Sequence, residues 1–354
     1  MPYYIIPYIY IFFLWINYYF NKVDFQRKNL LLFVFLLPAF LIAVLRGNIG
    51  TDTFFYLGLF SLHEKGMVTD GYEPGFLLLT FLISKLGLGA RFGVALISVI
   101  TSFLLIKLFS RSKETIALFV VVFFPIFYFD FTMNGIRYGL SFALAAWAVH
   151  YLYEKKYLYT TILSIVAISI QYSALLIVLV FISNLIKKKY IFIFLGILLV
   201  LMTLTSTFDF FLDHLAGKQE SYSHIQSPGI FSGIAPLIQF LFIYFCFLFY
   251  SDKKSSKKLL HIILILEIIS FIIAKFTYAG LRLQTTFLFT LMIYILNNID
   301  LLEIKNRSMF MFRMIIISLF STAMFMKNIT SVGDEEQLTP FLPYKFFWEQ
   351  SYPL

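Results

Sequence analysis

The sequence has few charged residues and a single cysteine. Charged residues make up 13% of its 354 positions and hydrophobic residues 60%, whereas charged residues average about 25% in soluble domains. This shortage of charge argues against a soluble domain and favours a protein that crosses a membrane several times. Because Cys246 has no second cysteine to pair with, an internal disulfide and a cysteine metal site are excluded as well.

Motifs of common soluble enzymes are also absent. The sequence contains no Walker motif and no Rossmann fingerprint, and His63 in "HEKG" lacks the second histidine of a zinc-protease helix. Asp209 and Asp213 form no compact Asp-x-Asp pair, so we expect no nucleotide-sugar metal site and no cofactor. The net charge of +9 does not indicate nucleic-acid binding, because lysines and arginines in short loops orient membrane proteins.

Long apolar runs occupy most of the chain. A helix needs about 20 mainly apolar residues to cross a bilayer, and the first run is too long and too aromatic for a signal peptide. We therefore expect an all-α polytopic integral membrane protein that forms one domain over residues 1–354. The expected runs are residues 3–21, 29–45, 91–110, 115–131, 136–153, 158–186, 190–207, 232–250, 259–279, 283–298 and 309–327.

Basic clusters between these runs predict the orientation of the chain. The positive-inside rule places short basic loops in the cytoplasm, so the N-terminus and the C-terminal tail are expected outside. The predicted outer segments are residues 46–73, 132–136, 208–231 and the tail 328–354, with about 11 to 13 membrane segments in total. The basic clusters are Lys22–Arg27–Lys28, Arg111–Lys113, Lys155–Lys156, Lys187–Lys188–Lys189, Lys253–Lys254–Lys257–Lys258 and Lys305–Arg307.

Two regions need a special arrangement to keep these clusters on one side. Residues 74–110 must cross an odd number of times, which predicts one full span plus a short partial helix over residues 73–88. The run 158–186 begins and ends beside cytoplasmic lysines, so it must cross an even number of times. Its length suits two short or re-entrant helices that meet near Gln171.

Arg46, Arg137 and Arg282 stand at the predicted outer ends of spans, against the orientation bias. Charges at membrane depth usually face a cavity or a partner, and the planar guanidinium suits phosphate. The arginines therefore suggest an anion-binding cavity that opens to the outside. Gly47 and Gly50 let the backbone bend and a ligand approach closely, and the Asn-Gly pair before Arg137 gives similar freedom.

Each of these residues also has a structural explanation. Arg46 could be a snorkelling anchor at a helix end, and Asp52 could cap a helix or neutralise Arg46. Glu73, followed by proline, could mark the start of a helix. The other two arginines could equally be structural, and only the gathering of all three on one face favours a functional interpretation.

Three segments of the chain carry a recognisable pattern, namely "LRGNIGTDTFFYLGLF", "YEPGFLLLTFLISKLG" and "FTMNGIRYGLSFALAAWAV". Together they resemble the EpsG-like branch of the Wzy-type bacterial polysaccharide polymerases. The third segment departs from the family pattern because Tyr138 stands where glutamine is usual. The matching positions are Arg46, Gly47, Gly50, Asp52 and Tyr56 in the first segment, Glu73, Pro74 and Gly75 in the second, and Asn134 and Arg137 in the third.

Three later segments extend the resemblance over most of the chain. "IQYSALLIV" is similar to the family's His-x-Ser-Ala segment, with Gln171 in the histidine position. "GLRLQTTFLF" places Arg282 like a later outer-face arginine, although the aromatic pair that usually follows is missing. "PFLPYKFFW" resembles the family's Pro-Tyr-Lys tail at Tyr344 and Lys345.

The resemblance implies an integral-membrane glycosyltransferase with a GT-C-like fold in the bacterial inner membrane. Such enzymes polymerise repeat units of O-antigen, capsule or exopolysaccharide that are carried on undecaprenyl pyrophosphate. They transfer the growing chain at the outer face onto the next lipid-linked unit. The implied partners are this lipid-linked oligosaccharide and membrane lipid, with a chain-length regulator and a flippase as protein partners.

The implied chemistry assigns roles to the matched residues. Arg46, Arg137 and Arg282 would neutralise the leaving pyrophosphate, while Glu73 or Asp52 would act as base toward the acceptor hydroxyl, with Glu73 slightly favoured. Substrate-binding roles fall on Gly47, Gly50, Tyr56, Asn134, Gln171, Tyr344 and Lys345. Tyr56 could stack on a sugar or pack against the polyprenyl chain, and packing is the more common role of such a residue.

The sequence is also compatible with two other classes of membrane protein. A lipid-linked oligosaccharide flippase also needs many spans and a cationic cavity, but internal repeats are expected there and no clear repeat is present. A membrane O-acyltransferase that modifies a surface glycan should carry a catalytic histidine, and none of the 5 histidines has a convincing setting. A lipid-A ligase shares the chemistry and is not separated from a polymerase by these arguments.

Overall fold

The computed structural model describes residues 2–20, 28–50, 52–67, 71–185, 229, 231–248, 254–299, 307–330 and 341–349. Within these ranges the regular structure is helical, apart from one isolated antiparallel bridge between Arg46 and Phe346. The all-α part of the predicted fold is therefore confirmed for the described residues. The GT-C-like architecture, the number of membrane segments and the single domain stay predictions.

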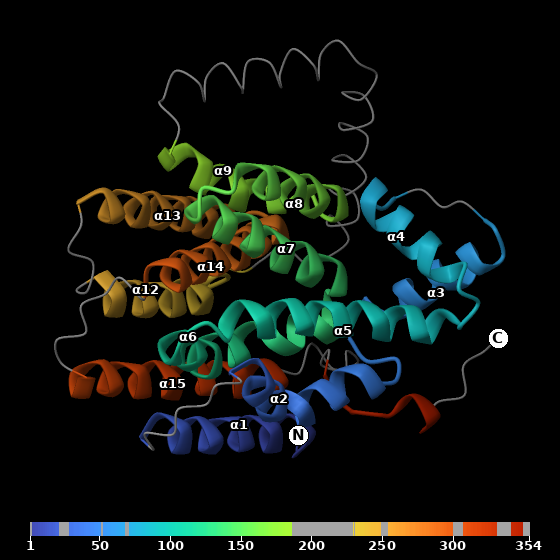
Figure 1. Ribbon diagram of the computed structural model, residues 1–354, viewed down its shortest axis with the longest axis horizontal. Helices are drawn as coiled ribbons and strands as arrows, with labels where there is room; N and C mark the ends of the chain where they lie inside the picture. The colour runs from blue at the N-terminus through green and yellow to red at the C-terminus, as the bar shows by residue number, and fades with distance from the viewer. Residues whose placement is uncertain are drawn as a thin grey trace, which may run out of the picture. The chain divides into compact units, whose positions relative to one another are not determined.

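The chain divides into two compact units, and Figure 1 labels their helices. Unit 1 comprises Met1–Ala174 and Ile295–Leu354, and unit 2 comprises Leu175–Tyr294. The helices assigned mainly to unit 2 are α9 (Ala174–Leu185), α12 (Ile234–Leu248), α13 (Lys254–Ile273) and α14 (Tyr278–Asn298). The helices of unit 1 are α1 (Pro2–Phe20), α2 (Lys28–Leu45), α3 (Thr53–Glu64), α4 (Pro74–Ser84), α5 (Ala90–Phe109), α6 (Lys113–Leu118), η1 (Phe119–Tyr128), η2 (Asp130–Asn134), α7 (Ile136–Tyr153), α8 (Tyr157–Ile170), α15 (Arg307–Thr330) and η4 (Phe347–Glu349).

The core of unit 1 is built around the phenylalanine-rich segment η1–η2, which is wound as a π-helix. Its rings contact one another, for example Phe119 with Phe123 at a centroid distance of 5.4 Å and Phe127 with Phe131 at 5.2 Å. These distances lie within the range at which aromatic pairs attract. Helices α1, α5, α7 and α15 all pack against this segment, so the turn that follows it, at Gly135, rests on a densely packed base.

Both special arrangements predicted from charge are confirmed at the level of helices. The run 158–186 forms α8 and α9, which are separated only by residues 171–173. The partial helix expected over residues 73–88 is α4, and the full span after it is α5. The expected run 190–207 lies outside the described residues, as does the predicted outer segment 208–231 except for residues 229 and 231.

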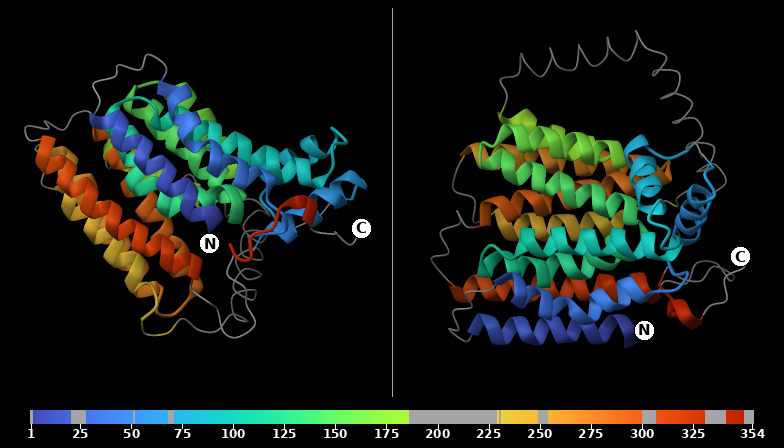
Figure 2. Two further views of the ribbon diagram at one scale, coloured as in Figure 1. Left: turned by 90° about the horizontal axis from the view of Figure 1, so that it is seen from below. Right: turned by 45° about the vertical axis from the view of Figure 1, so that its right-hand side comes forward.

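Helix α3 lies within residues 46–73, and the prediction that this segment is on the outer side stays a prediction. The 12 residues of α3 extend only about 18 Å at 1.5 Å per residue, too short to cross a bilayer. The predicted runs do not include it because they were selected by the length that a span needs. Figures 1 and 2 place α3 and α4 at the same end of unit 1 as the C-terminal segment 341–349.

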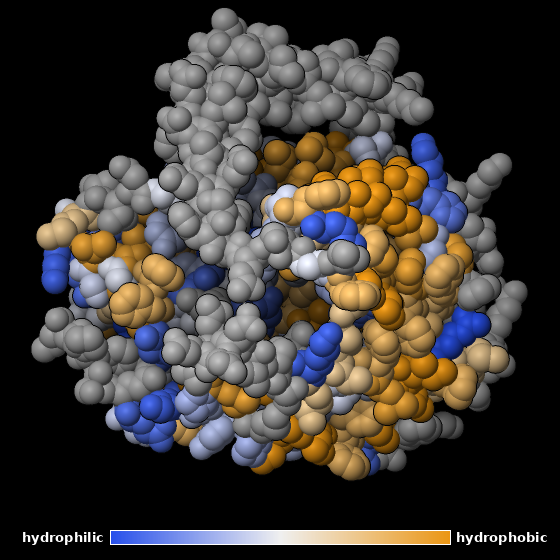
Figure 3. Space-filling model, turned by 180° about the vertical axis from the view of Figure 1, so that it is seen from behind, coloured by the Kyte–Doolittle hydropathy of each residue, from blue (hydrophilic) through white to orange (hydrophobic). Residues whose placement is uncertain are grey.

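The described helices fit a membrane protein. By length and composition, α5 and α14 could cross a bilayer, and five shorter helices are apolar. Helix α13 exposes large apolar side chains along its length, including Ile265 at 56% and Ile272 at 54%. Figure 3 shows hydrophobic residues covering much of the described surface in that view. Lipid is the natural environment for such a surface, because exposed apolar patches of this kind are rare on soluble monomers.

Candidate functional site

The loop that follows α2 packs against the end of η2, just before α7. Gly50 has a φ of +102°, and a Cβ atom there would come within 2.5 Å of the Met133 carbonyl oxygen. Only glycine suits both the backbone conformation and this close approach. Thr53, at the start of α3, adds a hydrogen bond from its hydroxyl to the same carbonyl oxygen at 3.2 Å. The first and third sequence motifs are thus brought together.

Arg46 is buried in unit 1, with 1% of its surface exposed. Its Nη1 donates to the carbonyl oxygens of Ala43 at 2.6 Å and Thr132 at 2.9 Å, and to Ser98 Oγ at 3.0 Å. Burial, assisted by the charge of Arg91, lowers the pKa of Arg46 to about 9, so the side chain is still charged at neutral pH. These contacts join α2, α5 and η2, which differs from the outward path of a snorkelling arginine.

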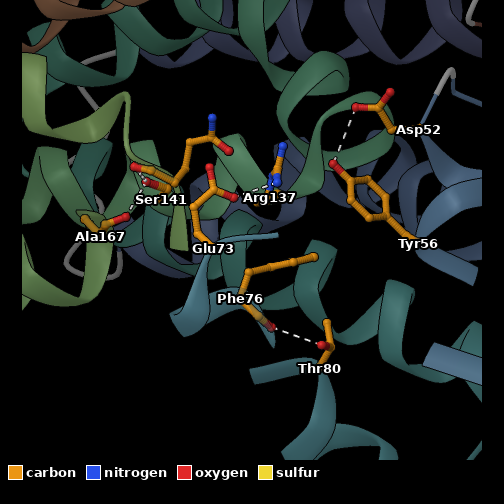
Figure 4. A network of polar contacts seen from close by, with 9 residues as sticks. Asp52, Tyr56, Glu73, Phe76, Thr80, Arg137, Ser141 and Ala167 are labelled. Atoms are coloured by element: carbon orange, nitrogen blue, oxygen red, sulfur yellow. Dashed lines mark hydrogen bonds and ion pairs between the residues drawn. The ribbon is translucent and has the colours of Figure 1, made fainter. Parts of the chain in front are cut away.

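Arg137 and Glu73 form a buried ion pair, in which Arg137 Nη1 donates to Glu73 Oε2 at 2.6 Å (Figure 4). The Glu73 side chain is fully buried, whereas that of Arg137 keeps 13% of its surface exposed. The guanidinium also lies over the rings of Tyr72, at 5.1 Å, and Phe76, at 5.9 Å. Glu73 precedes Pro74 at the start of α4 but makes no capping hydrogen bond, so its carboxylate serves the arginine instead.

Asp52 and Tyr56 lie beside this ion pair. Asp52 occupies the N-cap position of α3 without a capping hydrogen bond from its side chain, and Tyr56 Oη donates to Asp52 Oδ2 at 3.4 Å. The Tyr56 ring packs edge-on against Phe76 at 5.7 Å. Its hydroxyl is within electrostatic range of both Asp52 and Arg137. Tyr56 therefore packs in the core and also links the two polar pairs.

The turn between α8 and α9 lies near Glu73 and the start of α4. A side chain on Gly75 would collide with Ser169, so the start of α4 packs directly on the end of α8. Tyr172 lies within electrostatic range of Glu73. Gln171 is 9% exposed, and its Oε1 is buried without a hydrogen-bond partner. The predicted substrate-binding role of Gln171 stays a prediction.

Residues 341–346 of the C-terminal segment, called the strap below, contact the loop that begins at Arg46. Gly47 N donates to the Lys345 carbonyl oxygen at 2.7 Å, and Tyr344 Oη donates to the Ile42 carbonyl oxygen at 2.9 Å. Tyr344 is buried and Lys345 is exposed. The predicted substrate-binding roles of both residues stay predictions. Their contacts show that the backbone of Lys345 holds the loop, while the Tyr344 hydroxyl fixes the segment on α2.

Asn134 and Arg282 are the two remaining predicted residues, and the backbone of Asn134 lies against Gly50. Asn134 donates from Nδ2 to Asp130 Oδ1 at 3.0 Å, within its own helical segment. Arg282 belongs to unit 2, is exposed, and lies 5.8 Å from the centre of the Tyr278 ring. The gathering of all three arginines at one cavity therefore stays a prediction.

Sequence reasoning missed Arg91, Tyr72 and Tyr172. Arg91 Nη1 donates to the carbonyl oxygens of Arg46 at 2.7 Å and Gly47 at 3.0 Å. It stands at the predicted outer end of a span, so the criterion that selected the other arginines could have found it. The two tyrosines carried no signal, because the sequence has 23 tyrosines. Among the described residues no group of three or more His, Cys, Asp or Glu is arranged to hold a metal ion.

A family model described as the EpsG family matches residues 28–346. The chain belongs to the EpsG family. Every site residue predicted from the sequence lies inside the matched range. Membership of this family suggests a polysaccharide polymerase-type role with glycosyltransferase-like activity, and it agrees with a membrane protein. No curated protein and no solved structure matches the chain.

Proposed function

We propose that this EpsG-family protein polymerises oligosaccharide repeat units linked to undecaprenyl pyrophosphate at the outer face of the bacterial inner membrane. The observation that carries the proposal is the buried Glu73–Arg137 ion pair beside Asp52 and Tyr56. It supplies a fixed positive charge and two carboxylates within one small region of unit 1. A transfer from a lipid pyrophosphate needs both kinds of group.

Arg137 is the residue best placed to meet the pyrophosphate. A guanidinium has five N–H donors, and Glu73 takes one from Nη1. The carboxylate and the rings of Tyr72 and Phe76 fix the direction of the side chain. Its exposed part can then donate to the oxygens of the leaving group as their negative charge develops. One such fixed donor is worth about 10²–10³ in rate.

Asp52 becomes the stronger candidate for the base once the contacts are known. Glu73 is fully buried and engaged with Arg137, which makes it a positioning residue. Asp52 is only partly buried and lies at the start of α3. In the proposed step the acceptor hydroxyl gives its proton to Asp52, and its oxygen forms the new bond to the anomeric carbon of the donor. The bond from that carbon to the pyrophosphate breaks, and undecaprenyl pyrophosphate leaves.

Arg46 acts indirectly in this scheme. Because its Nη1 donates to groups of α2, α5 and η2, it sets the position of the loop that carries Asp52. The strap over residues 341–346 also contacts this loop, through the backbones of Lys345 and Phe346. We therefore assign Arg46 and Tyr344 to positioning.

The test is the length of the surface glycan in a deletion strain complemented with wild-type protein, Arg137→Ala, Arg137→Lys or Lys85→Ala. Lys85 is an exposed charge at the end of α4 and is the matched control. With membrane levels equalised, the deletion and Arg137→Ala should leave single repeat units on the surface, Arg137→Lys should give intermediate chains, and Lys85→Ala should give normal chains.

Other outcomes would assign another class. Lipid-linked units that accumulate at the inner leaflet of the deletion strain would indicate a flippase. Chains of normal length that lack an acyl group would indicate an O-acyltransferase. Normal chains in Arg137→Ala alone would retain the polymerase but remove Arg137 from its site.

A further inference from the structure

Unit 2 buries an acidic residue in the middle of an apolar helix. Glu267 is fully buried in α13, within the sequence "HIILILEIISFII". An ionised carboxylate is costly in such surroundings unless it is paired. Ionisable residues in apolar membrane helices mark functional positions for the same reason. Neither the sequence motifs nor the proposed transfer reaction uses this residue.

The hydrogen-bond partner of Glu267 is a neutral amide. Gln284 of α14 is also fully buried, and its Nε2 donates to Glu267 Oε1 at 2.9 Å. The same nitrogen donates to the Gly233 carbonyl oxygen at 3.1 Å, just before α12 begins. Both hydrogens of the amide are then in use. Gly233 has a φ of +76°, and a Cβ atom there would collide with Gln284 Oε1, so the close approach needs glycine.

Two oxygens of this network are left over, namely Glu267 Oε2 and Gln284 Oε1. Both are buried without a hydrogen-bond partner. An ionised carboxylate can only accept hydrogen bonds, so two neighbouring groups would each keep an unsatisfied acceptor, a costly arrangement inside a protein. A carboxylic acid, in contrast, has an O–H group that donates.

We propose that Glu267 is a proton-binding site that closes a two-bond acid–amide pair with Gln284. In this pair the amide N–H donates to the acid carbonyl oxygen, and the acid O–H on Oε2 donates to the amide oxygen. One proton satisfies both remaining oxygens and removes the buried charge. The ligand of the site is the proton itself.

Other titratable groups near the ends of α13 and α14 have contacts of their own. Lys275 Nζ donates to the Ser232 carbonyl oxygen at 2.6 Å, and Arg282 lies over Tyr278. His261 Nδ1 hydrogen bonds with Tyr244 Oη of α12 at 2.7 Å. The Glu267 contact that the structure records is with an uncharged group, which favours the neutral acid.

The proton would stabilise the contacts between three elements of unit 2. Through Gln284 it joins α13 and α14 to the turn before α12. Arg282 stands two positions before Gln284, in the first turns of α14. Loss of the proton should therefore loosen the end of α14 that carries this arginine. The inference does not depend on the proposed glycosyl transfer.

Carbodiimide labelling tests the proton directly. Dicyclohexylcarbodiimide is an apolar reagent that adds to protonated carboxyl groups, and labelled peptides are identified by mass spectrometry. Full-length protein in membranes should carry the label at Glu267, and the label should be lost in Glu267→Gln. Glu73, which is equally buried but paired with Arg137, is the internal control and should stay unlabelled. An unlabelled Glu267, or a Glu267 that sodium protects from the reagent, would overturn the proposal.

Substitutions give a second, independent measurement. Glutamine at position 267 keeps a carbonyl acceptor and an N–H donor for Gln284, so Glu267→Gln should retain the melting temperature and abundance of the wild type. Glu267→Leu removes both groups and should lower them. If Glu267 is ionised and bound to a cation, both variants should be destabilised to a similar extent, and that result would also reject the proposal.

Discussion

Among the described residues, each unit buries one glutamate, and the partners of these two glutamates differ. Glu73 in unit 1 faces the charged guanidinium of Arg137, whereas Glu267 in unit 2 faces the neutral amide of Gln284. Both glutamates are fully buried. A buried charge is tolerated when an opposite charge with good geometry compensates it, and otherwise the group becomes neutral. The same side chain therefore serves two purposes in one molecule.

The site at Glu73 therefore holds a charged pair, whereas the site at Glu267 is proposed to hold a proton. In unit 1 the partner arginine keeps part of its surface exposed, so its positive charge remains available to an anion. In unit 2 the hydrogen bonds are internal to the unit. We therefore expect changes at Glu73 to affect the surface polysaccharide and changes at Glu267 to affect mainly the stability of unit 2.

The largest effect is expected from Glu73→Ala. Removing one partner of a buried ion pair costs about 3–5 kcal/mol because the other charge is left uncompensated, and the partial exposure of Arg137 should reduce this figure. Polysaccharide chains should also shorten, since Arg137 loses its orientation. Thermal unfolding of purified protein and glycan length in the complemented strain check the two parts. The loss of stability in Glu73→Ala is compared with that in Glu267→Gln. Equal losses in the two variants would contradict the distinction between a charged pair at Glu73 and a neutral pair at Glu267.

An intermediate effect is expected from Gly50→Ala. The positive φ and the nearby Met133 carbonyl oxygen should make alanine strained by about 1–3 kcal/mol. Gly58 is the matched control, because it lies within α3 and a Cβ atom there meets no atom within 4 Å. Alanine at position 58 should stabilise the helix by about 0.5–1 kcal/mol. Opposite changes in melting temperature are expected, and a fall of similar size in both variants would show that the loop is not held as described.

Some parts of the fold and the candidate site could be predicted from the sequence, and others could not. The charge pattern predicted the short helices α4, α8 and α9, because the number of crossings between basic clusters must be odd or even. The partner of Glu73 could not be predicted, since an ion pair 64 positions apart along the chain depends on how α4 and α7 pack. Helix α3 was missed because it is too short for a span, and Glu267 was missed because a lone acid belongs to no motif.

The smallest effect is expected from Tyr344→Phe, which removes only the hydroxyl that donates to the Ile42 carbonyl oxygen. The loss of one hydrogen bond should cost about 1 kcal/mol. If Tyr344 only positions the Arg46 loop, glycan length should change little at equal protein levels, and the melting temperature should fall slightly. If the hydroxyl also binds the substrate, as the sequence predicts, glycan length should fall far more than stability does. Comparing the two readouts in this one variant decides whether the strap supports the site or forms part of it.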